Sequence, residues 1–125
     1  MVTGIGVDVV HIQRMRKLSK HVKERLFHPR ELAEAELMAE AVQAEYFAGR
    51  FAAKEAFGKA LGTGLSQLSL QDIWVERSPS GKPELHLSGK AEALLGTRSA
   101  LLSISHDEPV AVAMVVLEGA DDATF

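Results

Sequence analysis

The sequence contains no cysteine, and only 6% of its 125 residues are aromatic. Without cysteine the chain has neither a disulfide framework nor a thiolate metal site, which argues against a disulfide-stapled secreted domain. No apolar run approaches the roughly 18–20 residues that cross a bilayer, and the N-terminal residues lack the basic segment that opens a signal peptide. We therefore expect a cytoplasmic protein with no membrane partner.

Several common catalytic and nucleotide-binding motifs are also missing. The sequence has no G-x-G-x-x-G and no G-x-x-x-x-G-K-[ST], and its five histidines include no H-E-x-x-H pair. A zinc site is therefore not expected. Ser105 and His106 are adjacent, and neighbours on a strand point to opposite faces, so they do not form a serine-hydrolase pair.

What the chain contains is the composition of one ordinary domain, with 46% hydrophobic and 25% charged residues. Its net charge of −3 hides a local asymmetry, because half of its 14 basic residues lie within residues 14–30 against one acid, Glu24. These basic residues are Arg14, Arg16, Lys17, Lys20, Lys23, Arg25 and Arg30. A basic segment on an acidic protein predicts a localised anionic partner.

Hydrophobic periodicity and turn residues predict an α+β fold with a single core. We expect strands at 2–10, 73–76, 84–87, 100–105 and 110–117, and helices at 11–25, 29–38, 43–61 and 89–95. The last strand is almost wholly apolar, so we expect the core or another subunit to cover both of its faces. We expect residues 119–125 to form a loose tail.

Asp8 is the first candidate for chemistry, because it stands in an otherwise apolar strand. It shares one face of that strand with Gly4 and Gly6. Carboxylates are rarely buried without a partner, and neighbouring glycines leave room for a close approach. From spacing alone, a cap for the following helix and a ligand for a metal or phosphate stay equally open.

The long central helix supplies further candidates. Glu55 and Lys59 are four residues apart, which by itself favours an ordinary exposed ion pair. Arg50 and Lys54 add cations that we expect near the same face. His106 ends a strand before a tight connection, where an exposed turn histidine is the commoner outcome. The residues alone therefore indicate a small α+β domain with possible metal-binding carboxylates.

Four blocks of the chain, taken together, indicate a family. They are residues 4–14, GIGVDVVHIQR; residues 47–64, FAGRFAAKEAFGKALGTG; residues 81–83, GKP; and residues 103–118, which begin SISHD and end in an apolar strand with Glu118. In order and spacing they resemble the holo-acyl-carrier-protein synthases, and the central block is the most specific. The resemblance spans nearly the whole chain.

The resemblance implies a 4′-phosphopantetheinyl transferase domain over residues 1–118, an antiparallel sheet packed with one long and several short helices. It implies a homotrimer with active sites between subunits. The reaction would move 4′-phosphopantetheine from coenzyme A to a serine of an acyl carrier protein, releasing 3′,5′-ADP, in fatty acid biosynthesis.

By the same resemblance, Asp8 and Glu55 would ligate Mg²⁺, and these two residues with Lys59 would be the catalytic set. Mg²⁺ commonly takes one or two protein carboxylates and completes its shell with water and substrate phosphates. Lys59 would contact the coenzyme A phosphates. The chain departs from the family pattern at Gly58, where a side chain such as serine is expected.

The resemblance also assigns the binding of both substrates. Arg50 and His106 would hold the nucleotide, His106 from the neighbouring subunit, and Lys82 and Pro83 would lie near the adenine. The residues expected to dock the acidic carrier protein are Arg14, Arg16, Lys17 and Lys20.

Two other functions remain open on the residues. One is a different Mg²⁺-dependent phosphotransferase or phosphatase. The other is a binding module whose basic helix grips an anion or a nucleic acid. The acidic net charge and the scarcity of aromatic residues argue against nucleic acid as a partner.

Overall fold

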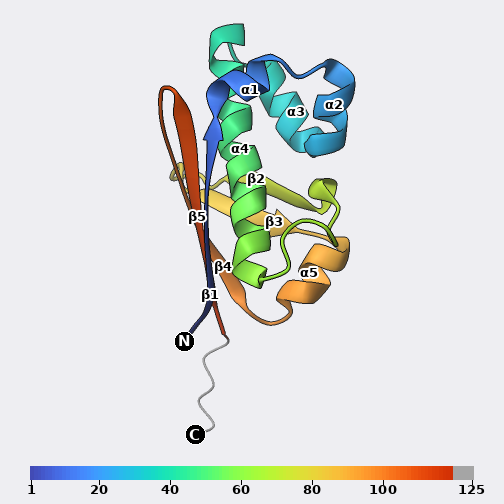
Figure 1. Ribbon diagram of the computed structural model, residues 1–125, viewed down its shortest axis with the longest axis vertical. Coiled ribbons are helices and arrows are strands. Elements are labelled where there is room, and N and C mark those ends of the chain that lie inside the picture. The colour runs from blue at the N-terminus through green and yellow to red at the C-terminus, as the bar shows by residue number, and fades with distance from the viewer. Residues whose placement is uncertain (120–125) are drawn as a thin grey trace, which may run out of the picture.

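The computed structural model describes residues 1–119 as a three-stranded antiparallel sheet packed on one long helix (Figure 1). The sheet has the order β1 (Val2–His11), β5 (Val110–Glu118), β4 (Ser99–Asp107), and the helix is α4 (Glu40–Leu61). A second antiparallel sheet pairs β2 (Ile73–Arg77) with β3 (Pro83–Leu87). The predicted α+β class is confirmed, whereas the predicted tail beyond Gly119 lies outside the described residues.

The remaining helices are short. They are α1 (Ile12–Arg16), α2 (Lys20–Leu26), α3 (Pro29–Glu36) and α5 (Gly89–Leu95), with a 3₁₀ turn at Leu70–Asp72. In Figure 1 the helices α1, α2 and α3 gather at one end of α4, and α5 lies near its other end. Within residues 1–119, no helix is both long and apolar enough to span a membrane.

Helix α4 is the centre of the core, and β1 lies directly on it. A Cβ atom at Gly6 would overlap the carbonyl oxygen of Ala56, and one at Gly4 would overlap that of Ala60. Only glycine therefore lets the strand come this close to the helix backbone. The close approach expected at these glycines is made by the protein's own helix.

The basic segment forms two helices where the periodicity predicted one helix over residues 11–25. Helix α1 ends at Arg16, and Ser19 then starts α2 by accepting a hydrogen bond from the backbone N–H of Val22 at 3.2 Å. Serine favours this capping position because its hydroxyl replaces a missing helical acceptor. Helix α4 begins at Glu40, three residues before the predicted start at residue 43.

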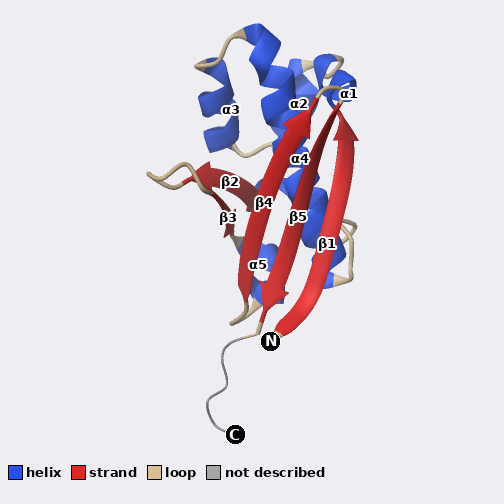
Figure 2. Cartoon of the chain, turned by 90° about the vertical axis from the view of Figure 1, so that its left-hand side faces the viewer, coloured by secondary structure: helices blue, strands red, loops and turns tan. Residues whose placement is uncertain are grey.

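The outer face of the three-stranded sheet is open and apolar. Figure 2 shows this face toward the viewer, with the helices behind it. The exposed fractions are 62% for Ile5, 48% for Val7, 55% for Val9, 45% for Leu101 and 44% for Met114. The core therefore covers only one face of β5, so the expectation that both its faces are covered is not met within one chain.

Candidate active site

Asp8 and Lys59 meet where β1 crosses α4. The Lys59 Nζ lies 2.9 Å from Asp8 Oδ1 and also donates to the carbonyl oxygen of Val7 at 3.1 Å. The Asp8 side chain is 17% exposed. It does not cap the next helix, because the N-cap of α1 is His11, which makes no side-chain capping bond. The capping alternative for Asp8 is wrong.

Glu55 lies one turn before Lys59 on α4 and shares this region with Asp8. Burial raises the pKa of the Glu55 carboxyl, and the negative charge of Asp8 raises it further, whereas Lys59 and Arg14 lower it. Asp8 thus lies close enough to disfavour the charge of Glu55, and a bound cation would relieve this repulsion. The ion pair expected between Glu55 and Lys59 is replaced by the pair of Lys59 with Asp8.

The donor set here fits a magnesium ion that relies on its substrate for most ligands. Asp8 and Glu55 offer hard carboxylate oxygens, and Lys59 engages only Oδ1 of Asp8. Within residues 1–119 no cluster of three or more Asp, Glu, His or Cys side chains is placed to hold a metal. Mg²⁺ suits such a pair because it keeps several waters and binds substrate phosphates.

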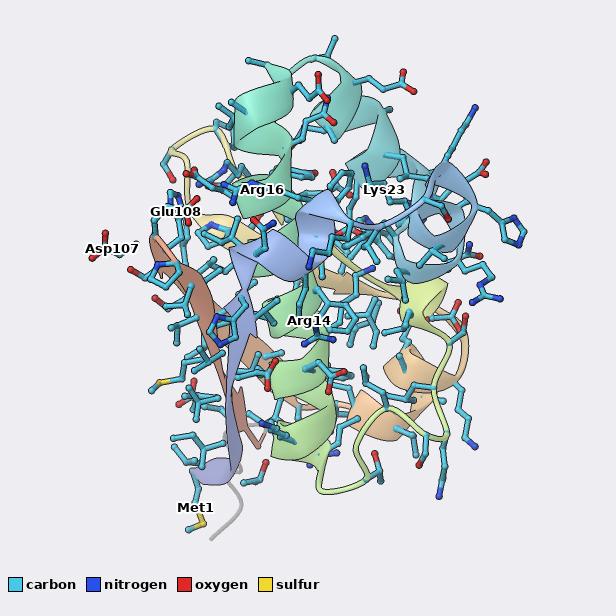
Figure 3. The ribbon with its side chains drawn as sticks, turned by 45° about the horizontal axis from the view of Figure 1, so that its top comes forward. Met1, Arg14, Arg16, Lys23, Asp107 and Glu108 are labelled. Atoms are coloured by element: carbon cyan, nitrogen blue, oxygen red, sulfur yellow. The ribbon has the colours of Figure 1, made fainter. Side chains whose placement is uncertain are left out.

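The cations predicted to dock a carrier protein lie in different surroundings. The Arg14 guanidinium stands 5.9 Å from the centre of the Phe51 ring, on the part of α4 next to Glu55. Arg16 pairs with Glu108 in the β4–β5 turn at 2.6 Å, and Figure 3 shows these two side chains together. Lys17 and Lys20 are exposed.

Arg50 lies on the other flank of α4 and is only 3% exposed. Its guanidinium carbon stands 4.0 Å from the centre of the Tyr46 ring, and its Nη2 lies 3.4 Å from Glu34 Oε1. Within the described residues, the buried Nε of Arg50 and hydroxyl of Tyr46 have no hydrogen-bond partner. Buried polar groups without a partner are rare in folded proteins.

A pocket of about 370 Å³ adjoins Arg50 between α4 and the end of β4. His106 lines it, 52% exposed, with its Nδ1 3.6 Å from Glu45 Oε2. Arg77 lines it as well and donates to the carbonyl oxygen of Gly81 at 2.8 Å. That bond ties the pocket to the β2–β3 turn, where the predicted adenine contacts Lys82 and Pro83 stand.

The predicted site residues therefore form two groups on separate flanks of one chain. Asp8, Glu55 and Lys59 belong to the β1 side, and none of them lines the pocket on the β4 side. Strand β5 lies between β1 and β4, which places the two edge strands about 10 Å apart. Within one chain the two groups therefore line different surfaces.

The position predicted for Lys54 from the sequence is wrong. It is fully buried, where a position near the face of Glu55 and Lys59 was expected. Its Nζ lies 2.8 Å from Glu31 Oε1 and donates to the carbonyl oxygen of Leu70 at 2.9 Å. Burial lowers the pKa of Lys54, and Glu31 opposes that shift.

Other charged and polar residues at the pocket were missed altogether. They are Glu34, Glu45, Tyr46 and Arg77. The only sequence signal was the spacing of Glu45 and Tyr46 from Arg50 on one helix, and it carries no information about β4.

The departure at Gly58 has a structural cause. A Cβ atom there would lie 2.8 Å from the backbone carbon of Gly64, in the loop that follows α4. The backbone N–H of Gly64 donates to the Gly58 carbonyl oxygen at 3.0 Å. Glycine at this position lets the loop fold against the helix.

Comparison with known proteins identifies the family. The family model described as the 4′-phosphopantetheinyl transferase superfamily matches residues 4–114. The chain belongs to this superfamily. A holo-[acyl-carrier-protein] synthase of Geobacillus kaustophilus is 45% identical over 122 residues, which cover 94% of this chain and 90% of that protein.

Solved structures of holo-[acyl-carrier-protein] synthases share the fold. The Bacillus anthracis protein in complex with CoA (3′,5′-ADP) has a TM-score of 0.85 and 39% identity, over 96% of this chain and 99% of that one. The Neisseria meningitidis protein has a TM-score of 0.84 and 35% identity, over 95% and 100%. The predicted enzyme, a synthase that transfers phosphopantetheine from coenzyme A to an acyl carrier protein, is confirmed.

Proposed function

We propose that this chain carries out phosphopantetheine transfer at clefts between the subunits of a homotrimer. In each cleft, Asp8, Glu55 and Lys59 come from one subunit, and Arg50 and His106 come from its neighbour. The observation that carries this proposal is the separation of the two groups on opposite flanks of α4. The first group has the carboxylates for a metal together with Lys59, and the second group has Arg50 and His106 for the nucleotide.

The open face of the sheet supports the assembly. Ile5, Val7 and Val9 of β1 lie 48–62% exposed there. Contiguous apolar surface of this kind marks an interaction site in a water-soluble fold. A head-to-tail contact between unlike edges, repeated until the rotation closes, gives a ring with one cleft per subunit. Such a ring brings the β1 side of one copy toward the β4 side of the next.

In the proposed reaction the carrier serine oxygen forms a bond to the phosphorus nearer the pantetheine. The phosphoanhydride bond of coenzyme A breaks, 3′,5′-ADP leaves with the bridging oxygen, and the serine proton is released. Asp8 and Glu55 would hold Mg²⁺. When bound, the ion neutralises charge on the diphosphate.

The other side chains act by position and charge. Lys59, held by Asp8 at 2.9 Å, offsets the negative charge that develops on the leaving diphosphate oxygen. Arg50 and His106 hold the nucleotide, and Lys82 and Pro83 border the adenine. Phosphoryl-group transfer needs little covalent help from the protein, so positioning supplies most of the rate.

The carrier protein docks on the basic helices in this proposal. Helix α1 starts directly after β1, so Arg14 stands six residues beyond Asp8. In Figure 3 Arg14 lies near the middle of the view beside α4, and Lys23 lies above it. A positive surface here attracts an acidic carrier and directs its serine toward Asp8. Arg16, Lys17 and Lys20 extend this surface.

Incubation with coenzyme A, Mg²⁺ and an apo-acyl carrier protein tests the reaction. We expect mass spectrometry to find the mass of one phosphopantetheine added to the carrier, and none when its serine is replaced by alanine. Hydrolysis of coenzyme A with an unmodified carrier would instead favour a magnesium-dependent phosphatase. The cytoplasmic location stays a prediction.

A further inference from the structure

The pocket beside Arg50 is lined by an anionic side chain as well as by cations. Glu45 lines the pocket and faces His106, with 3.6 Å between Oε2 and Nδ1. Glu34 approaches Arg50 Nη2 from α3, at 3.4 Å, and does not line the pocket. The nucleotide phosphate of the proposed function must therefore enter a space that already contains a carboxylate.

The contact between Glu45 and His106 is too loose and too exposed to hold the fold together. A charged nitrogen and a carboxylate in a strong hydrogen bond are about 2.7–2.9 Å apart. Here the separation is 3.6 Å, and the side chains are 30% and 52% exposed. Half-exposed pairs of this kind contribute little to stability. Glu45 can therefore swing into solvent without disturbing the core.

The pocket has cations that would favour this movement. Arg50, Arg77 and His106 all line the same pocket as Glu45. A phosphate brings several acceptor oxygens and up to two negative charges, whereas Glu45 brings one charge to His106 only. The phosphate is thus the better ligand, and Glu45 is the weaker occupant.

We propose that Glu45 is a resident competitor for the phosphate of the donor nucleotide and sets the nucleotide affinity of the enzyme. This inference rests on the proposed function, which assigns Arg50 and His106 to the nucleotide. Glu45 faces His106 while the pocket is empty and moves aside when the phosphate binds. Because it competes with the same phosphate on 3′,5′-ADP, it also favours release of this product after transfer.

Isothermal titration calorimetry with 3′,5′-ADP tests the inference in the Glu45→Gln variant. The glutamine keeps the size of the side chain and removes its charge. We expect 3′,5′-ADP to bind about two- to tenfold more tightly, since a competing contact and a repulsion are both removed. Adenosine carries no phosphate, and its affinity should stay the same. The KM for coenzyme A should fall with no proportional rise in kcat.

Glu36→Gln is the matched control, because it makes the same charge change on α3 at an exposed position that does not line the pocket. The inference is overturned if Glu45→Gln leaves 3′,5′-ADP affinity unchanged or weaker, or if Glu36→Gln tightens it equally. Arg50→Gln separates this failure from a failure of the proposed function. If Arg50→Gln does not weaken 3′,5′-ADP binding, the pocket is not the nucleotide site. Both the inference about Glu45 and the proposed nucleotide site are then wrong.

Discussion

Two lysines of helix α4, five residues apart, each pair with a carboxylate from another element, and the two pairs differ in almost every other respect. Lys54 and Glu31 lie 2.8 Å apart with both side chains 0% exposed. Lys59 and Asp8 lie 2.9 Å apart with the lysine 52% exposed. The distances match, so separation alone does not distinguish a structural pair from a functional one.

The difference lies in what else each carboxylate contacts. Glu31 also accepts hydrogen bonds from the backbone N–H of His28 at 3.1 Å and of Val75 at 3.1 Å. Both of its oxygens are therefore engaged in joining α3, α4 and β2. Asp8 gives one oxygen to Lys59 and faces Glu55, which is a second negative charge. A carboxylate with spare capacity beside a like charge is ready for a cation, whereas a saturated one is not.

The largest expected effect follows from removing the carboxylate at the open pair. Asp8→Asn keeps the shape of the side chain and removes half of the proposed metal set. We expect phosphopantetheine transfer to fall about 10³-fold or more, because charge stabilisation of the transferred group is lost. The thermal midpoint should change little. Transfer assays and thermal unfolding of the same sample measure both; full activity would remove Asp8 from the site.

The buried pair should respond in the opposite way. Lys54→Met leaves Glu31 as an uncompensated buried charge, and we expect a loss of about 3–5 kcal/mol in the free energy of unfolding. Adding Glu31→Gln removes that charge and keeps an acceptor for one backbone N–H, so the double variant should recover part of the loss. Urea unfolding measures it. A single variant as stable as the wild type would contradict the structural role.

A smaller effect is expected at the basic residues, where Arg14 and Lys20 should differ in their effects on kcat and on the KM for carrier. Arg14 lies over Phe51 and lowers the pKa of Glu55, so we expect it to affect both carrier binding and the proposed site. We expect Arg14→Gln to lower kcat and to raise the KM for carrier. Lys20→Gln, on α2, should raise only the carrier KM, by about two- to fivefold, and less at high salt. Equal effects of Lys20→Gln on the KM values of both substrates would contradict carrier docking.

The smallest expected effect is on the pH dependence of stability, through His28 at the start of α3. His28 Nδ1 accepts the backbone N–H of Arg30 at 3.0 Å, and burial lowers the pKa of His28 despite the opposing charge of Glu31. Below pH 6.5 the unfolded chain therefore binds a proton that the folded chain resists, and stability falls as the pH drops. His28→Asn keeps a capping acceptor and should flatten this fall. Urea unfolding of both proteins, followed by circular dichroism at pH 7 and pH 5, tests this expectation. An equal fall in the urea midpoint of both proteins would contradict it.

Sequence patterns predicted most elements because each depends on local periodicity. The alternation in residues 2–10 placed Asp8 on the face with Gly4 and Gly6, and that face does meet α4. The break between α1 and α2 was missed although Ser19 is a good capping residue, because the apolar spacing continues through it. Local pattern therefore predicted the type of structure better than its boundaries.

The burial of Lys54 and the exposure of Lys59 could not be predicted from local pattern. Helical spacing indicates that residues five apart point in different directions, but which direction is buried depends on α3, β2 and the 3₁₀ turn. The role of Glu45 depends on the position of β4, more than 50 residues away in the chain. The two-flank arrangement likewise follows from the strand order, which no local pattern encodes.

Mixing two inactive variants tests most directly whether the two flanks meet between subunits. Asp8→Asn alters the proposed metal side and Arg50→Gln alters the proposed nucleotide side, so we expect neither variant alone to transfer phosphopantetheine. After unfolding, mixing in equal amounts and refolding, random assembly gives about a quarter of the clefts both native sides. We predict recovery to about a quarter of wild-type activity. Mixtures that stay as inactive as the separate variants would contradict an active site shared between chains.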